Sequence, residues 1–432
     1  MTFDLILKGA HVYQGELVKK DIGVKDGLIT AIDDDLNGAE NTLNLEGKTV
    51  LPGLIDSQVH FREPGLVHKE DIESGSKAAA LGGICTFFEM PNTSPPTTTE
   101  QSIKEKVDKA KKVSYVNFAF FMGATQHNLE ELKKAHSIEG CCGIKIFLGS
   151  STGSLLLYEE SALMNVFKNT KGMISCHSEN EDMLKERISV RDQHRTAHGH
   201  PEWRSVETAV SSTKRLIGLA KAAKRKVHVL HISTKEEMKF LAENKDFCTV
   251  EVLANHLSLH SPDCYDRLDT FTQMNPPVRT IDHQVGLWEG VNNGTVDVMG
   301  SDHAPHTRDE KEKGYPHSPS GMPGVQTLVP LMLNHVANGK LSLNRLIELL
   351  AERPSELWGL NKGKIAIGKD ADFTVVDLER KEEITNQQQA SKVGWTPYEG
   401  KVVKGWPTHT ICGGKVVMQE GRLLQRGGTP AC

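Results

Sequence analysis

Residues 205–233 read SVETAVSSTKRLIGLAKAAKRKVHVLHIS, a helical stretch followed by a short apolar run. The helical part covers residues 205–224, and the run at residues 227–233 is rich in Val, Leu and Ile. Helical and strand-like segments that alternate in this way are typical of βα units in a parallel sheet. The same alternation fills the middle of the chain.

Eight such apolar runs predict eight parallel strands. They cover residues 53–60, 84–90, 115–124, 143–149, 172–177, 227–233, 248–254 and 295–303. Eight strands separated by helices favour an α/β fold of the (β/α)₈ barrel type. A doubly wound sheet is the alternative, but the sequence contains neither G-x-G-x-x-G nor G-x-x-x-x-G-K-[ST], the glycine loops that such nucleotide-binding sheets use.

The two ends of the chain have a different pattern. Residues 4–52 alternate short β-type stretches with Gly, Asn and Asp turns, and similar stretches return from about residue 362 onward. Hairpins of this kind predict antiparallel strands. We therefore expect one small β-sandwich domain made of residues 1–52 plus 362–432, and a catalytic barrel over residues 53–361.

Composition excludes several classes of protein. The chain has 432 residues, a formal net charge of −5 and 25% charged residues, so it offers no basic surface for nucleic acid. No apolar run approaches the roughly 18 residues of a membrane span, and the first residues do not resemble a signal peptide. The 8 cysteines show no disulfide framework, which predicts reduced thiols in a cytoplasmic protein.

Five polar side chains lie in or at the ends of the predicted strands. They are His60, Lys145, His177, His231 and Asp302. Barrel active sites are built at the carboxyl ends of the strands, so these side chains are expected to meet at one mouth. Three imidazoles and a carboxylate suit Zn²⁺, which prefers nitrogen and oxygen ligands. The sequence therefore predicts a metal site.

Lys145 is the unusual member of this set, because it lies within the apolar run GIKIF. Burial disfavours an ammonium and lowers its pKa. A neutral amine can capture CO₂ as a carbamate, whose two oxygens can bridge two cations. The other interpretation is a lysine whose stem is buried and whose charge reaches solvent or a salt bridge.

Seven motifs give the chain a resemblance to a known family. They are IDSQVHFREPG (55–65), EMPNTSPPT (89–97), GIKIFLGSSTG (143–153), SCHSE (175–179), VLHIST (229–234), MNPPVR (274–279) and SDHAPH (301–306). Together with GWTPYEGKVVKG (394–405), they resemble the dihydroorotases of the amidohydrolase superfamily over nearly the whole chain. Hydantoinases and allantoinases share the metal pattern but differ around the arginine and the asparagines.

The resemblance implies a metal-dependent hydrolase that interconverts L-dihydroorotate and N-carbamoyl-L-aspartate in pyrimidine synthesis. In that family, hydroxide held between two divalent ions attacks the ring amide. One ion would be held by His60, carbamylated Lys145 and Asp302, and the other by Lys145, His177 and His231. Asp302 would also carry the proton to the ring nitrogen.

The resemblance further implies a set of substrate-binding residues. A guanidinium fork is well suited to the substrate carboxylate, and Arg62 follows His60 by two positions, on the same side of a segment that we expect to be extended. Asn92 and His306 are further expected donors, and Asn275 would contact the ring amide. An ion pair at the surface for Arg62, and turn chemistry for the asparagines, are the structural alternatives.

Gln58 departs from the family pattern, which usually has His-x-His at the end of the first strand. An amide oxygen is a poorer zinc ligand than imidazole, so one or two Zn²⁺ ions per chain are both expected possibilities. Two other functions stay open: another cyclic amidohydrolase, such as a hydantoinase or allantoinase, and a catalytically silent subunit that scaffolds a transcarbamoylase.

Three further expectations concern the surroundings of the site. The polar, Gly- and Pro-rich segment 306–324 is predicted to be a loop that covers the site. His194, His198 and His200 are not expected to bind metal, because they lie in the connection between the fifth and sixth strands. The partner is expected to be a small molecule, and the chain to be a homo-oligomer.

Overall fold

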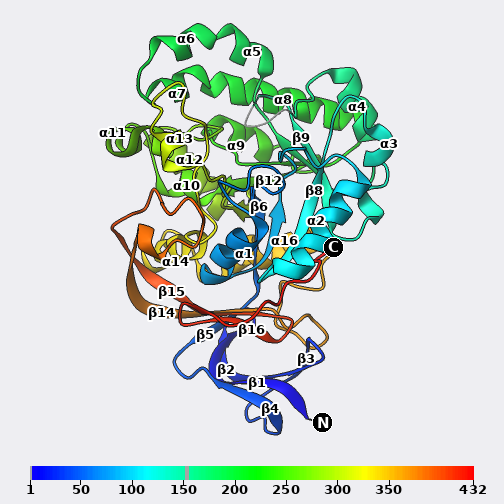
Figure 1. The fold of residues 1–432 in the computed structure, drawn as a ribbon, viewed down its shortest axis with the longest axis vertical. Helices are drawn as coiled ribbons and strands as arrows, with labels where there is room; N and C mark the ends of the chain where they lie inside the picture. Colours follow the sequence, from blue (N-terminus) through cyan, green and yellow to red (C-terminus); the bar gives the residue numbers. More distant parts are fainter. Residues whose placement is uncertain (1, 151–154) are drawn as a thin grey trace.

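A computed structural model describes residues 2–150 and 155–432 of the chain, so residues 151–153 of the motif quoted above lie outside it. The central sheet has eight strands in the order β13-β12-β11-β10-β9-β8-β7-β6. All neighbours in it are parallel. The strands are β6 Leu54–Val59, β7 Ile84–Glu89, β8 Asn117–Gly123, β9 Cys141–Phe147, β10 Ile174–His177, β11 Val227–Val229, β12 Cys248–Leu253 and β13 Val298–Gly300. Each predicted run overlaps one strand, so the predicted barrel is confirmed (Figure 1).

The first and eighth strands approach each other and close the ring. Val59 pairs with His303 in a parallel bridge, and the backbone N–H of His60 donates to the carbonyl of His303 at 2.7 Å. The two predicted runs that contain His231 and Asp302 extend beyond their strands, because β11 ends at Val229 and β13 ends at Gly300. His231 and Asp302 therefore lie just beyond their strands.

Helices surround the barrel in the places that the alternation predicts. The predicted helix at residues 205–224 is α8, which begins after Ser205, whose side chain accepts from the N–H of Thr208. The α-helices are α1 Ile72–Leu81, α2 Glu100–Val113, α3 Leu129–Leu132, α4 Glu160–Asn169, α5 Glu181–Glu186, α6 Ile188–Gln193, α7 Gly199–Trp203, α8 Val206–Ala223, α9 Lys235–Ala242, α10 Ala254–Ser258, α11 Asp263–Leu268, α12 Ile281–Asn292, α13 Arg308–Lys311, α14 Leu328–Ala337, α15 Leu343–Ile347 and α16 Arg353–Trp358.

A second sheet joins the two ends of the chain, as predicted. Its order is β17-β16-β15-β14-β5-β1-β2-β3, with β4 paired to β1 (Figure 1). The strands are β1 Phe3–Tyr13, β2 Leu17–Lys25, β3 Leu28–Asp33, β4 Ala39–Asn44, β5 Thr49–Pro52, β14 Phe373–Ile384, β15 Lys401–Cys412, β16 Lys415–Gln419 and β17 Arg422–Leu423. The antiparallel pairing of β5 with β14 joins the amino-terminal strands to the carboxyl-terminal ones. The domain boundaries themselves stay a prediction.

The segment between β14 and β15 returns to the mouth of the barrel. The indole N–H of Trp395 donates to the carbonyl of His306 at 2.8 Å, and the hydroxyl of Tyr398 donates to Oδ1 of Asn255 at 2.7 Å. Both aromatic side chains are buried. The small domain therefore supports the loop that follows β13.

Two composition-based expectations can be compared with the structure. No helix in the described part of the chain is long and apolar enough to cross a membrane. All eight cysteines are free thiols, and all but Cys432 are buried, in agreement with the predicted absence of a disulfide framework.

Candidate active site

The five predicted metal ligands lie at the carboxyl-terminal side of the barrel strands. His60 follows β6 directly, Lys145 lies in β9, His177 is the last residue of β10, and His231 and Asp302 each follow their strand by two residues. All five are at most 8% exposed. Parallel strands of one barrel bring their ends together, so the fold collects these side chains from five strands.

The backbone at three predicted site residues adopts a left-handed conformation. The φ angles are +65° at Arg62, +40° at His231 and +47° at Asp302, and these are three of the seven described non-glycine residues with positive φ. Such conformations cost about 1–3 kcal/mol each and gather at functional sites. The expectation that Arg62 lies on an extended segment was wrong, because the chain turns there; the turn, and not strand alternation, places its side chain.

One half of the site is built around Asp302. Its Oδ1 lies 3.1 Å from Nε2 of His60 and accepts from Nε2 of Gln58 at 3.1 Å. The other ring nitrogen of His60, Nδ1, lies 2.7 Å from Oδ1 of Asn92. Burial alone would raise the pKa of Asp302, but His60, His231 and Lys145 outweigh it and hold that pKa well below its usual range. Asp302 is therefore ionised at neutral pH.

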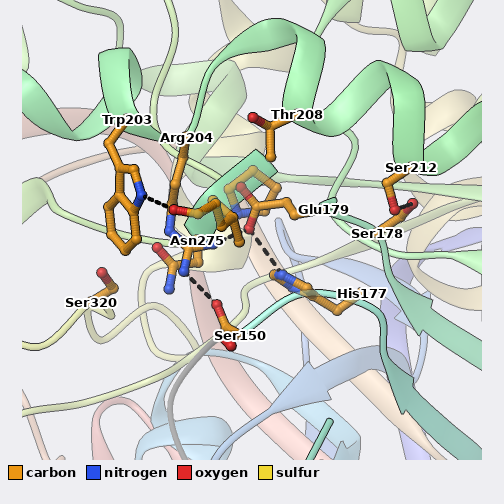
Figure 2. Close-up of polar contacts among 12 residues, drawn as sticks. Ser150, His177, Ser178, Glu179, Trp203, Arg204, Thr208, Ser212, Asn275 and Ser320 are labelled. Carbon is orange, nitrogen blue, oxygen red and sulfur yellow. Dashed lines mark hydrogen bonds and ion pairs between the residues drawn. The ribbon is translucent and has the colours of Figure 1, made fainter. Parts of the chain in front are cut away.

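The other half of the site pairs His177 with His231. Nδ1 of His177 lies 3.0 Å from Nε2 of His231. Nε2 of His177 lies 2.9 Å from Oε2 of Glu179, and this oxygen accepts a hydrogen bond from Nη1 of Arg204 (Figure 2). Burial would raise the pKa of Glu179, but Arg204 and His177 outweigh it and lower that pKa to about 2. Burial lowers the pKa of both histidines, so neutral imidazoles face each other.

Lys145 is close enough to both halves to act on their charges. Its charge lowers the pKa of each of the four other predicted ligands, which places it within electrostatic reach of all of them. Burial lowers the pKa of Lys145 to about 8, although Asp302 and Glu251 oppose the shift. Lys145 is buried, as the sequence predicts, and the alternative of an ammonium that reaches solvent is wrong.

The donor set can be tested for its fit to a metal. Over residues 2–150 and 155–432, no three His, Cys, Asp or Glu side chains come together as they would around one ion. Each half offers two such groups, and a metal needs at least three protein ligands. Carbamylated Lys145 would supply the third ligand to both halves, so the residues fit a metal only with that modification.

A narrow cavity of about 20 Å³ opens beside Asp302. Its wall contains three of the four predicted substrate-binding residues, Arg62, Asn92 and Asn275. The remaining lining residues are His60, Asp302, Ala304, Ser320 and Gly321. The fourth predicted residue, His306, lies behind Arg62, with its Nε2 3.2 Å from Nη2 of the guanidinium. The structure thus brings the predicted substrate-binding residues together.

Arg62 is buried, and it forms no ion pair with an acidic side chain in the described part of the chain. Its Nε donates to the carbonyl of Pro305 at 3.3 Å. Burial lowers the pKa of Arg62 to about 10, so it is charged at neutral pH. A buried charge is normally paired, so this guanidinium is available for an anion that enters the cavity.

The segment 306–324 contributes directly to the cavity wall through Ser320 and Gly321. It is not loop throughout, because Arg308–Lys311 form the helical turn α13, begun by a capping box at Thr307. Nζ of the buried Lys311 donates to the carbonyls of Pro319 and Gly321 at 2.8 and 3.0 Å. These bonds hold the end of the segment against the site.

Sequence reasoning missed two groups near the site. His200, which was not expected to bind metal, is buried, with its Nε2 2.9 Å from Oδ1 of Asn275, so it supports that predicted substrate-binding residue. His194 and His198 pair instead with Glu202 and Asp266 on the surface. The second missed group is Glu179 with Arg204, described above.

Comparison with known proteins gives a consistent result. The Amidohydrolase family profile matches residues 49–417. The dihydroorotase of Methanosarcina mazei is 35% identical over 98% of this chain and 96% of its own, and that of Bacillus licheniformis is 36% identical over 95% and 97%. Among solved structures, the L-hydantoinase (dihydropyrimidinase) of Arthrobacter aurescens superposes with a TM-score of 0.95, at 30% identity over 99% of both chains. The chain belongs to the amidohydrolase family.

Proposed function

We propose that this chain is a dihydroorotase, which interconverts L-dihydroorotate and N-carbamoyl-L-aspartate in pyrimidine synthesis. One observation carries the choice of substrate: Arg62 is a buried guanidinium in the wall of the cavity, and no acidic side chain of the described residues pairs with it. A substrate that carries a carboxylate supplies the missing partner. The relatives that bear the name dihydroorotase cover almost the whole chain.

Asp302 is assigned the proton transfer. Opening the ring adds water across an amide, so a proton must travel from the water to the ring nitrogen. Asp302 is ionised and lines the same cavity as Arg62, which supports its role as the proton acceptor for a ring that Arg62 would bind. Asn92 and Asn275 line the cavity as well and are assigned to the polar edge of the substrate, with His306 supporting Arg62.

The cofactors are assigned as one or two Zn²⁺ ions and a CO₂-derived carbamate on Lys145. His60 and Asp302 would hold one ion and His177 and His231 the other, with the carbamate shared between them. A bound divalent ion lowers the pKa of water enough to supply hydroxide near neutral pH and polarises a carbonyl oxygen. The low pKa of buried Lys145 favours the neutral amine that reacts with CO₂.

A second candidate function is hydantoin hydrolysis, which the close superposition with the L-hydantoinase favours. A hydantoin ring without a carboxylate would leave Arg62 without an anionic partner, so the charge of Arg62 favours dihydroorotate. The silent scaffolding subunit is the remaining alternative, because Gln58 replaces an expected ligand. We further propose that the protein acts in the cytoplasm, that its partner is a small-molecule substrate, and that it forms a homo-oligomer.

The test is an ultraviolet assay of L-dihydroorotate ring opening by the full chain, supplied with zinc and bicarbonate. Turnover of dihydroorotate in preference to hydantoins is expected. Turnover of hydantoins alone would support the second candidate. A folded, metal-loaded protein that turns over neither substrate would support the silent subunit.

A further inference from the structure

Glu179 is a buried carboxylate that the proposed reaction does not use. It lies two residues after His177, beyond the end of β10, and is completely buried. Its Oε2 lies 2.9 Å from Nε2 of His177 and accepts a hydrogen bond from Nη1 of Arg204 (Figure 2). Nη2 of the same guanidinium donates to the carbonyl of Ser150, so Arg204 is held from two sides. A salt-bridged carboxylate therefore stands directly behind one predicted metal ligand.

The contact determines which ring nitrogen of His177 carries the proton. A neutral imidazole has one N–H and one lone pair, and the hydrogen bond at one nitrogen decides the state of the other. The ion pair with Arg204 keeps Glu179 an acceptor, so Nε2 carries the hydrogen. Nδ1 is then left with its lone pair.

That lone pair points toward the second predicted ligand of the same half. Nδ1 of His177 is 3.0 Å from Nε2 of His231. Two nitrogens that each lie about 2.0–2.1 Å from one ion can be separated by this distance. His231 has no equivalent support: among the described residues no carboxylate lies within ion-pair distance of its ring, whereas Oε2 of Glu179 lies 2.9 Å from Nε2 of His177.

We propose that Glu179 is a positioning residue for metal binding: together with Arg204 it fixes the ring and the tautomer of His177 so that Nδ1 faces the ion. This inference rests on the metal site of the proposed function. Carboxylates behind histidine ligands raise metal affinity by about 10–100-fold in other metal sites. Glu179 would act on affinity without touching substrate.

The first experiment measures the affinity of the metal-free full chain for Co²⁺ and Zn²⁺ by competition with a chelator. Glu179→Gln keeps the shape but removes the charge, so we expect affinity to fall about 10–100-fold, with a changed Co²⁺ absorption spectrum. Glu237→Gln is the matched control. Glu237 is also buried, but it pairs with the hydroxyls of Thr213 and Thr234 and contacts no predicted ligand. Its substitution should leave affinity and spectrum unchanged.

A second measurement reads the tautomer in the wild-type protein and uses a variant only to assign the signals. In protein labelled with ¹⁵N-histidine, the ring nitrogens of His177 are identified by the signals lost in His177→Asn. The proposal expects the Nε2–H tautomer in the metal-free protein. A predominant Nδ1–H tautomer, or a Glu179→Gln protein that binds Co²⁺ with the wild-type affinity and spectrum, would overturn the proposal.

Both measurements are made without substrate, which separates this proposal from the proposed function. If the wild-type protein failed to open dihydroorotate while Glu179→Gln still weakened metal binding, the function would be wrong and the role of Glu179 would stand. If the wild-type protein opened dihydroorotate and Glu179→Gln left metal binding unchanged, the reverse would hold.

Discussion

The two halves of the predicted metal site are built differently. In the His177 half, two imidazole nitrogens face each other, and a carboxylate fixes the proton on the far side of one ring. In the Asp302 half, the amide of Gln58 donates to the same carboxylate oxygen that faces His60. An imidazole can present a lone pair to an ion, whereas an NH₂ group occupies an acceptor that the ion would use.

The halves also differ in what they face. His60 and Asp302 line the cavity with Arg62, whereas Lys145, His177 and His231 do not. We infer that the two halves differ in function: the His177 half is suited to binding a metal ion tightly, and the Asp302 half is suited to contacting the substrate. Four substitutions test this division.

The largest effect is expected from Asp302→Asn, which keeps the shape of the side chain but removes the proton acceptor. General acid–base groups contribute about 10²–10⁴-fold, and we expect kcat for dihydroorotate to fall within that range. The assay is ring opening at saturating substrate, with metal content and circular dichroism as controls for the site and the fold. A folded, metal-loaded variant with nearly wild-type kcat would remove Asp302 from the chemistry.

Arg62→Met tests the substrate side of the same half. Hydrogen bonds to a charged group contribute about 1.5–3 kcal/mol, so kcat/KM for dihydroorotate should fall about 10–100-fold. Hydrolysis of a ring without a carboxylate should change little. Arg308→Met, at an exposed position of the neighbouring turn, is the matched control. Equal losses on both substrates would show that Arg62 supports the cavity and does not recognise a carboxylate.

Gln58→His addresses the difference between the halves directly. An imidazole in place of the amide would free an acceptor on Asp302 and add a zinc ligand, so metal affinity of this half should rise by about tenfold, worth about 1.4 kcal/mol. Metal titration of the apo protein should then show a stronger second binding step. Gln58→Asn keeps an amide at this position and should not strengthen the second metal-binding step. A wild-type protein that already binds two ions with equal affinity would contradict the comparison.

The barrel was predictable from sequence because its eight buried strands leave short apolar runs between helical stretches. The positions of the predicted ligands could also be read from the sequence, because barrel active sites are built at the carboxyl ends of the strands. The sequence could not show how these side chains are oriented. Arg62, His231 and Asp302 have left-handed backbone conformations, which an alternation of polar and apolar residues does not predict.

The missed residues depend on partners that lie far away in the chain. Glu179 becomes a supporting carboxylate only because Arg204, before α8, folds back onto it. His200 lies beside His194 and His198 in sequence, and nothing there distinguishes the buried ring from the two surface rings. The sequence contains one weak indication of the role of Glu179, its position two residues after the strand-end residue His177. The pairing with Arg204, which makes the role clear, is visible only in the structure.

The smallest predicted effect concerns Asp56, whose side chain joins the backbone next to Asp302 to the backbone at Gln58. Its Oδ1 accepts from the N–H groups of Ser301 and Gln58 at 3.0 and 3.3 Å, and burial raises its pKa to about 7. The folded metal-free protein therefore holds this proton up to a higher pH than the unfolded chain does, so stability falls as pH rises from about 4 through about 7. The slope for one proton cannot exceed about 1.4 kcal/mol per pH unit. The free energy of unfolding of Asp56→Asn, measured in urea, should lack this fall with pH. If wild type and variant had the same pH dependence, Asp56 would be ionised in the folded protein, and a carboxylate would accept hydrogen bonds from the N–H groups of Ser301 and Gln58.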